Sequence, residues 1–503
     1  MVRVRRLCRA VSALIAVVAL IVAVGACGRE AAGPQAVREG ADAAKFADEI
    51  RQRISTDAMM AHLQKLQDIA DAHGGNRAAG EPGYDASVDY VAGALRDKGF
   101  DVQTPEFEVR VFKGENGTVT SGGASLVAMP LQFTIGTSPE GLTAPLVPAR
   151  PGEAPGCAAT DYDGLPVQGA VVLVDRGTCP FAQKMANAVA RGAVGVIIAN
   201  SVDEKEMGGT LGEDTDVLVP VVSVSKADGA ALRAKPEQVT IKISAETREF
   251  KSRNVIAQTK TGGTDNVVMV GAHLDSVPEG PGINDNGSGV AAVLETALQM
   301  GAEPDVRNAV RFGFWGAEEL GLVGSASYIE TLDVEALKDI ALYLNFDMLA
   351  SPNPGYFTYD GDQSAPRTRN DSAPRVPEGS AGIERLLVEY LASADKESQD
   401  TSFDGRSDYD AFTLAGIPSG GLFAGAEEKM SAEQAELWDG KADEPFDPNY
   451  HKDTDTIEHI DRTALGIQGA GVGYVAAFYA QDQGGRNGMP DRADRTRHVV
   501  APS

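Results

Sequence analysis

Hydrophobic residues recur at helical spacing in two segments near the beginning of the 503-residue chain. The first predicted helix starts after Ser55 or Thr56, either of which can cap it, and ends at the glycine pair 74–75. A second helix is expected from about Tyr84 to Gly99. The apolar positions that repeat three and four residues apart are Met59, Leu63, Leu66 and Ile69 in the first helix, and Val88, Val91 and Leu95 in the second.

The hydrophobic pattern then changes to that of short strands. A β-rich stretch from Asp101 to Phe112 comes first, and residues 120–248 contain brief β-branched runs separated by glycine and proline. A helix is expected at 182–191, between the first two runs. We interpret 120–248 as an inserted domain, with strands predicted at Ala170–Val174, Gly195–Ala199 and Val217–Val224.

From Asn254 onward, strand and helix patterns alternate, which favours a mostly parallel sheet with helices on both faces. The sequence therefore predicts an α/β domain made of residues 49–119 and 249–483, on either side of the insert. Residues 484–503 are rich in glycine, arginine, aspartate and proline and are expected to be disordered. Buried strands are predicted at Val267–Val270, Ala309–Phe314 and Ala341–Phe346, and a helix at Gly289–Met300.

Residues 1–26 have the pattern of a secretory signal, because four arginines precede an uncharged apolar run from Ala10 to Ala26. The run ends in Val-Gly-Ala-Cys, which resembles the bacterial lipobox, where the cysteine is acylated and becomes the mature N-terminus. Cys27 would then carry the lipid and anchor the protein to the outer side of the cell membrane. A transmembrane anchor is the alternative, since the run is close to the minimum spanning length. Residues 27–48 are predicted to be a flexible tether.

Charge and cysteine content narrow the possible functions. The formal net charge of −27 gives a surface that repels nucleic acid, so no nucleic-acid partner is expected. Of the four cysteines, Cys8 leaves with the signal and Cys27 carries the lipid. Cys157 and Cys179 remain, and in an oxidising compartment they can pair, closing a loop worth about 3 kcal/mol. They are too few, and lack nearby histidines, for a cysteine zinc site.

Polar residues follow several of the predicted strands, and ligands in open α/β sheets bind beyond the carboxyl ends of strands. A single carboxylate in such a place is more often a helix cap or a solvated loop residue. Two histidines and three carboxylates directed toward one rim instead suit zinc, and two ions bridged by a carboxylate form a hydrolytic centre. The candidate ligands are His273, Asp285, Glu319, Asp347 and His451, with Glu318 beside one of them.

The segments AHLDSV, GINDNGSG, FWGAEELGLVGS, LNFDM, RSDYDAF and YH, together with GGNRAAGEPGYDASVDYV, resemble the dizinc aminopeptidase family that includes secreted bacterial leucyl aminopeptidases and vacuolar aminopeptidase Y. The resemblance implies the zinc exopeptidase fold and two zinc ions per chain. On the matching positions, His273 and Asp347 would bind one zinc, and Glu319 and His451 the other. Asp285 would bridge the two ions.

The same resemblance implies catalytic roles. Glu318 would be the general base, and Tyr450 would donate a hydrogen bond to the developing oxyanion. Asp275 would orient the His273 imidazole, as expected for the partner of a metal-bound histidine. Arg406, in GRSDYDAF, lies in a region that lines the substrate site in related enzymes. An arginine there could instead fix the C-terminal carboxylate of a substrate.

The insert has a resemblance of its own. Its segment Val171–Asn200 resembles the protease-associated domain, in which many members place a disulfide where Cys157 and Cys179 fall. This implies a lid or a substrate-access module without catalytic groups.

Together these observations predict a zinc-dependent aminopeptidase that acts on peptides with a free N-terminus. A carboxypeptidase or another amidohydrolase on the same dizinc scaffold is the first alternative. The second is a surface-binding lipoprotein that has lost catalysis, although the full set of ligands and Glu318 favours an enzyme. The sequence gives no prediction of the oligomeric state.

Overall fold

A computed structural model describes residues 34–152, 154–204, 207–213, 215–365, 376–485 and 488–500. The chain forms two compact units, one from the segments up to Pro105 and from Arg253 onward, and one from Glu106–Ser252. The second unit contains the predicted insert 120–248 and extends beyond it at both ends, through the long strands β2 (Glu106–Ser121) and β8 (Gln238–Arg253). The predicted signal and Cys27 lie outside the described residues.

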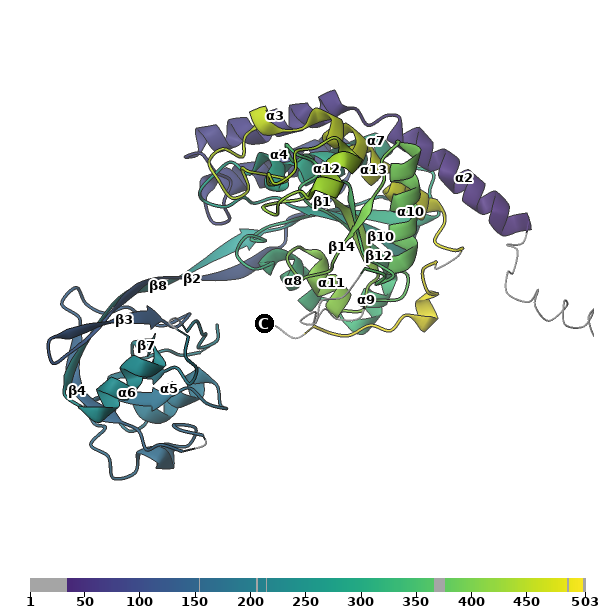
Figure 1. The fold of residues 1–503 in the computed structure, drawn as a ribbon. Coiled ribbons are helices and arrows are strands. Elements are labelled where there is room, and N and C mark those ends of the chain that lie inside the picture. The colour runs from purple at the N-terminus through teal and green to yellow at the C-terminus, as the bar shows by residue number, and fades with distance from the viewer. Residues whose placement is uncertain are drawn as a thin grey trace, which may run out of the picture. The chain divides into compact units, whose positions relative to one another are not determined.

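The first unit is built on an eight-stranded sheet with the order β1-β9-β11-β10-β12-β15-β13-β14 (Figure 1). The four central strands, β11, β10, β12 and β15, run parallel to one another. β1 and β9 pair antiparallel with their neighbours, whereas β13 pairs antiparallel with β15 and parallel with β14. The strands are β1 (Asp101–Gln103), β9 (Val255–Gln258), β10 (Gly263–His273), β11 (Asn308–Trp315), β12 (Ile340–Phe346), β13 (Phe357–Tyr359), β14 (Gln399–Thr401) and β15 (Ser419–Phe423).

Helices cover both faces of this sheet. They are needed because successive residues of a strand point to opposite faces, and apolar residues of the central strands point to both. Val268 and Val270 of β10 belong to the larger core, which also includes residues of α2, α3, α4, α7, α10 and α13, whereas Met269 packs in a second core with residues of α8, α9 and α11. The predicted α/β fold is thereby confirmed. The helices are α2 (Pro34–Arg51), α3 (Thr56–Ala72), α4 (Pro82–Asp97), η2 (Ile283–Ser288), α7 (Gly289–Met300), α8 (Val323–Glu330), α9 (Val334–Asp339), α10 (Ser380–Ser393), α11 (Tyr409–Leu414), α12 (Ala432–Trp438), η3 (Ile457–His459), α13 (Arg462–Gln481) and η4 (Arg492–Asp494).

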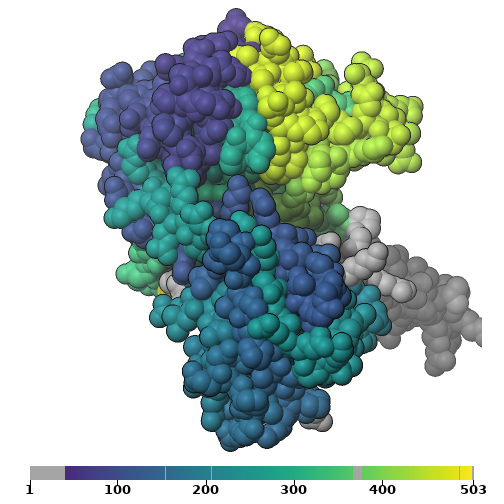
Figure 2. Space-filling view, turned by 90° about the vertical axis from the view of Figure 1, so that its left-hand side faces the viewer, coloured from purple at the N-terminus to yellow at the C-terminus, as the bar shows by residue number. Residues whose placement is uncertain are grey.

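The flexible tether predicted at 27–48 is wrong from Pro34 onward, where helix α2 begins. Its Ala43, Ala47 and Ile50 are buried and recur at helical spacing, a pattern that the small, alanine-rich composition concealed. Ile50 reaches the surface of α13 at Gly473, where the missing side chain leaves room. The N-terminal and C-terminal segments accordingly lie side by side at the surface, in purple and yellow (Figure 2).

The disordered tail predicted at 484–503 is also wrong for the residues that the structure describes there. Arg495 and Arg497 are buried, and their guanidinium groups donate to backbone carbonyls of β10, α9 and β12. Arg495 donates to the carbonyls of Asp265 and Lys338, at 3.0 and 2.6 Å. The polar composition of the segment concealed this docking. Each arginine supplies several N–H donors, and these satisfy carbonyl oxygens that need a donor in the folded protein.

No helix within the described ranges combines the length and the apolar character needed to cross a membrane.

The second unit is a closed barrel of seven strands in the order β2-β3-β7-β6-β5-β4-β8, in which β4, β5, β6 and β7 are parallel neighbours. Two buried, mostly aliphatic clusters pack against opposite faces of β5 and β6. Besides β2 and β8, its elements are β3 (Ala124–Pro130), β4 (Leu142–Pro148), η1 (Ala159–Tyr162), β5 (Val171–Asp175), α5 (Phe181–Val189), β6 (Gly195–Ala199), β7 (Val221–Val224) and α6 (Lys226–Ala234).

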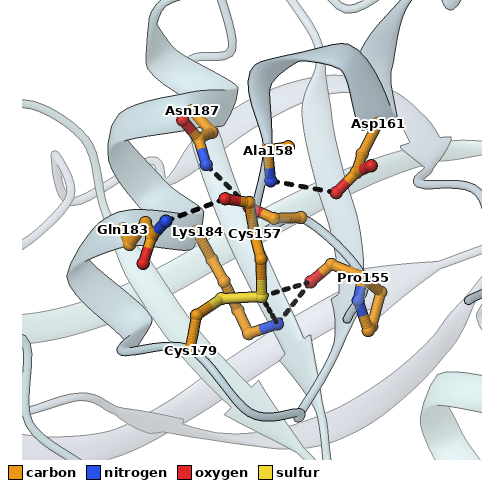
Figure 3. Close-up of a disulfide and its surroundings, with 9 residues drawn as sticks. Pro155, Cys157, Ala158, Asp161, Cys179, Gln183, Lys184 and Asn187 are labelled. Carbon is orange, nitrogen blue, oxygen red and sulfur yellow. Dashed lines mark hydrogen bonds between the residues drawn. A yellow bond between two sulfur atoms is a disulfide. The ribbon is translucent and has the colours of Figure 1, made fainter. Parts of the chain in front are cut away.

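The predicted disulfide between Cys157 and Cys179 is confirmed, with Cα atoms 5.8 Å apart (Figure 3). It joins the loop before η1 to the residues just before α5. Two side chains of α5 hold the same loop, because Gln183 donates to the Cys157 carbonyl at 2.8 Å and Asn187 donates to the Gly156 carbonyl at 3.0 Å. The disulfide therefore reinforces a loop that hydrogen bonds already attach to the helix.

Candidate metal centre

Three neighbouring strands of the sheet in the first unit lead to potential metal ligands. β10 ends at His273, Asp347 directly follows β12, and β11 is followed by Glu318 and Glu319. The order β11-β10-β12 brings these three strand ends to one rim. A tight turn precedes the two glutamates, since Ala317 adopts a left-handed φ of 57°.

A fourth carboxylate, Asp285, comes from the loop before α7. Asp455 accepts the backbone N–H groups of Asn284 and Asp285, at 2.8 and 3.0 Å. The Asn284 side chain donates to Asp447 at 2.7 Å. These buried hydrogen bonds fix the loop, so that the Asp285 carboxylate is held against His273 and against His451, which comes from the segment between α12 and α13.

The two oxygens of Asp285 face two different histidines. Oδ1 lies 3.3 Å from Nε2 of His273, and Oδ2 lies 3.2 Å from Nε2 of His451. Each histidine also approaches a second carboxylate: His273 Nε2 is 3.3 Å from Asp347 Oδ1, and His451 Nε2 is 3.1 Å from Glu319 Oε2. The cluster thus consists of two histidine–carboxylate pairs that share Asp285.

Burial and crowding of like charges shift the ionisation of this cluster. Burial raises the pKa of Glu319 to about 7, and the charge of Asp285 adds to the shift. Burial likewise raises the pKa of Glu318 well above its usual range. Although burial acts to lower it, the pKa of His451 is raised to about 10 by its hydrogen bonds to Asp285 and Glu319. Positive charge is therefore favoured between these side chains.

The donor atoms fit zinc. The buried oxygens Asp347 Oδ1 and Glu319 Oε1 accept no hydrogen bond from any residue that the structure describes, although buried acceptors are normally satisfied. Imidazole nitrogens and carboxylate oxygens are donors that zinc takes in enzymes. A cation between these atoms would supply the missing partner of both oxygens.

Asp275 lies behind His273 and contacts more than the predicted imidazole. Its Oδ1 is 3.8 Å from His273 Nδ1, while Nδ1 itself is 3.3 Å from the Asp275 carbonyl. The two carboxylate oxygens also accept the backbone N–H groups of Glu318 and Glu319, at 3.1 and 3.3 Å. The fully buried Asp275 therefore couples the position of the histidine to that of both glutamates.

Beside the cluster is a pocket of about 350 Å³. Its wall contains the residues of the first unit that the sequence predicted to bind metal, to act in catalysis or to bind substrate. Asp275 is the exception. Apolar side chains supply another part of the wall, namely Met348, Phe357, Tyr359, Phe423 and Phe446. The predicted site residues in contact with the pocket are His273, Asp285, Glu318, Glu319, Asp347, Arg406, Tyr450 and His451.

Arg406 already has partners of opposite charge. Its guanidinium lies 2.9 Å from Glu427 and 3.3 Å from Glu428. It also donates to the Tyr450 hydroxyl, at 3.2 Å. Arg406 is thus linked to the predicted oxyanion donor.

Sequence reasoning missed two groups that hold the centre together, Asp455 and Arg77. The guanidinium of Arg77 is fully buried and donates to the carbonyls of Pro281 and Gly282, at 2.9 and 2.6 Å, and to that of Leu274. It thereby connects the loop after His273 to the loop that leads to Asp285. An isolated arginine or aspartate in a loop gives no signal of such a role.

Fold and centre together define a class of protein. A mostly parallel α/β sheet whose carboxyl ends hold zinc-type ligands beside a pocket is the architecture of a metal-dependent hydrolase. Residues 254–476 match Peptidase family M28, and residues 142–232 match the PA domain. The chain is 65% identical over 501 residues to the "Probable lipoprotein aminopeptidase LpqL" of Mycobacterium tuberculosis, a match that covers 100% of both chains.

The chain therefore belongs to peptidase family M28 and carries an inserted PA domain, so the predicted peptide hydrolase is confirmed. Solved structures agree. The aminopeptidase from Aneurinibacillus sp. strain AM-1 is 26% identical, with a TM-score of 0.61 over 88% of this chain and 98% of that one. The zinc aminopeptidase from Bacillus subtilis is 27% identical, with a TM-score of 0.50 over 86% of this chain and 97% of that one.

Proposed function

We propose that this protein is a zinc-dependent aminopeptidase that removes N-terminal residues from peptides at a two-zinc centre. The observation that carries the proposal is the position of Asp285, whose two oxygens face separate histidine–carboxylate pairs. One metal ion needs only one such pair, whereas a shared carboxylate suits two ions. The names of the relative and of both solved structures support the aminopeptidase activity.

In this proposal His273 and Asp347 hold one zinc, Glu319 and His451 hold the other, and Asp285 bridges them. The bound ions supply Lewis acidity, which polarises the scissile carbonyl and makes a water molecule more acidic. The neutral imidazoles and ionised carboxylates needed for binding are favoured once the ions are present.

Glu318 is the proposed general base. Its carboxylate lines the pocket and its Oε2 lies 4.0 Å from His273 Nε2, next to the ligands without belonging to either pair. It takes the proton of the attacking water and returns it to the leaving amine. Tyr450 donates its hydroxyl hydrogen to the developing oxyanion, and this hydrogen is free for the substrate because Arg406 donates to the same oxygen.

Charge on the wall of the pocket supports cleavage at the N-terminus. Among the described residues that line it, the arginine and the lysine are both paired, Arg406 with Glu427 and Glu428, and Lys429 with Asp443 at 2.9 Å. A carboxypeptidase needs an available cation for the C-terminal carboxylate. The surplus carboxylates favour a free ammonium group instead.

The proposal includes a lipid anchor at Cys27, on the outer side of the cell membrane. The Val-Gly-Ala-Cys sequence supports it, as does the lipoprotein name of the M. tuberculosis relative. An anchored enzyme would act on peptides outside the cytoplasm.

The activity is tested with matched pairs of aminoacyl amides that carry either a free or an acetylated amino group. Hydrolysis of the free form alone, its loss after chelation, and its recovery with about two zinc ions per chain are the expected results. Equal hydrolysis of the acetylated form would reject the aminopeptidase, and full activity with one zinc would reject the two-metal centre.

A further inference from the structure

A second group of carboxylates lies outside the predicted zinc centre, in the same unit. Oxygens of Asp360, Glu384 and Asp400 lie within 4.8 Å of one another. Asp360 and Glu384 are each only 8% exposed, which is unusual for carboxylates without a cation nearby. No lysine, arginine or histidine among the described residues forms an ion pair with any of the three carboxylates.

The register of the sheet places this group on the face opposite the pocket. Phe357 and Tyr359 of β13 line the pocket, so Thr358 between them points to the other face. In β14, Thr401 lines the pocket, whereas Asp400, which pairs with Thr358 in register, points away from it. The backbone N–H of Asp360 still bonds to Thr401, at 2.8 Å, so Asp360 continues the alternation and shares the face of Thr358.

Thr358 provides an independent sign of a ligand on this face. Its side chain is fully buried, and its Oγ1 has no hydrogen-bond partner among the described residues. A buried hydroxyl without a partner is costly. Since Thr358 lies beside Asp400 and two residues before Asp360, its side chain lies on the face of the strands on which the three carboxylates gather.

Burial and mutual repulsion raise the pKa values of two of these carboxylates. Burial raises the pKa of Glu384 to about 7, with added contributions from Asp362, Asp400 and Asp360. The pKa of Asp400 is also raised, first by burial and then by Asp360 and Asp362. A bound cation would remove this repulsion.

We propose that Asp360, Glu384, Asp400 and the Thr358 hydroxyl bind a calcium ion. All four donors are hard oxygens, which suit calcium, whereas zinc favours nitrogen and sulfur as well. Calcium also tolerates an irregular set of ligands, while magnesium demands near-octahedral geometry and retains waters.

The site would join three elements, the end of β13, β14 and helix α10. The opposite face of β13 and β14 supplies Phe357, Tyr359 and Thr401 to the pocket. Calcium should therefore stabilise the protein and also fix one wall of the pocket. The second effect, on substrate binding, rests on the proposed function, whereas calcium binding itself does not.

The experiment uses the full-length chain loaded with zinc, so that calcium does not enter the zinc centre. Isothermal titration with calcium chloride should give one calcium ion per chain, and the midpoint of thermal unfolding should rise with calcium concentration. Asp400→Asn, at the exposed ligand, and Thr358→Val, which keeps the side-chain shape, should each weaken calcium binding, the first by about tenfold or more. Asp68→Asn, which removes one exposed carboxylate from α3, should bind calcium as the wild type does.

Absence of calcium binding to the zinc-loaded protein would overturn the proposal, as would unchanged affinity in Asp400→Asn. Equal weakening in Asp68→Asn would also overturn it, because the effect would then come from net charge. Equal stabilisation by magnesium chloride would reject the assignment to calcium. A protein that binds calcium but does not hydrolyse aminoacyl amides would retain this site and reject only the proposed function.

Discussion

The carboxylate of Asp455 accepts a hydrogen bond from the backbone N–H of Asp285 at 3.0 Å. Asp285 is the residue whose carboxylate faces both histidines. Its other oxygen accepts the N–H of Asn284. Asp455 is buried, and burial raises its pKa to about 8, although both hydrogen bonds act to lower it. The loop that presents Asp285 therefore depends on a carboxylate that never touches the pocket in the described structure.

We predict that Asp455→Asn weakens zinc binding by roughly 10–100-fold, because an amide offers one acceptor where the loop needs two. Zinc content after dialysis against a graded series of chelator concentrations measures the effect. Asp453→Asn, at an exposed neighbour, is the matched control and should retain zinc. Unchanged zinc affinity in Asp455→Asn would show that the loop holds its shape without this contact.

Glu318 and Glu319 are adjacent but should respond differently to substitution. Glu318→Gln should keep the zinc content and lower kcat by roughly 10²–10⁴-fold, because it removes the proposed general base. Glu319→Ala should lower zinc content as well as rate, because it removes a ligand. Metal analysis and kinetics of both variants provide the measurement. Loss of zinc from Glu318→Gln alone would exchange the two roles.

Arg406 should act through Tyr450 rather than through the C-terminus of the substrate. Arg406→Gln should lower kcat/KM equally for a dipeptide and for the corresponding aminoacyl amide, which has no terminal carboxylate. Tyr450→Phe should lower the rate for both substrates by roughly 10²–10³-fold, as expected for loss of an oxyanion donor. A selective loss for the dipeptide in Arg406→Gln would instead favour recognition of a carboxylate.

The disulfide should stabilise the inserted PA domain alone. Replacing Cys157 and Cys179 together by alanine should lower the free energy of unfolding of this unit by about 3 kcal/mol, through loss of the closed loop. Denaturant unfolding followed by limited proteolysis of the insert would detect the change. Zinc content should stay at the wild-type level, since no proposed zinc ligand lies in that unit; its loss would indicate that the damage spreads.

Cys27→Ala should prevent acylation, so that the protein leaves the membrane fraction or keeps its signal. Cell fractionation and N-terminal sequencing of the mature protein measure this. Cys8→Ala is the control, because that residue is removed with the signal in our interpretation. Wild-type membrane partition and an unchanged mature N-terminus in Cys27→Ala would reject the lipid anchor.

Local sequence patterns predicted the helices and strands whose apolar residues recur at regular spacing. Gly289–Met300 is the helix that its spacing indicates, and Ser55 caps α3 by accepting the N–H of Ala58 at 3.1 Å. The residues of the proposed metal centre were predictable as a group because strand ends and recognisable motifs mark them, and the structure brings them together beside one pocket. Asp455 and Arg77 were not, since their partners are backbone groups of loops far away in the sequence.

The predictions for residues 27–48 and 484–503 were wrong because the average composition of a segment does not show which of its residues are buried. Ala43, Ala47 and Ile50 give α2 a narrow apolar stripe among polar residues, so that the average over 27–48 resembles a tether. Arg495 and Arg497 look solvated by residue type, yet their N–H groups meet carbonyls that only the folded sheet brings within reach. Both errors arose where tertiary contacts decide the structure.

Helix α2 also sets how far the proposed enzyme can stand from the membrane. Because helix α2 begins at Pro34, only residues 28–33 separate the proposed acylated Cys27 from the first turn of this helix. Even fully extended, these reach about 25 Å at most. A flexible tether through residue 48 would have allowed the pocket to lie much farther from the membrane surface. With a lipid on Cys27, this short connection would confine peptide cleavage to substrates that pass close to the lipid surface.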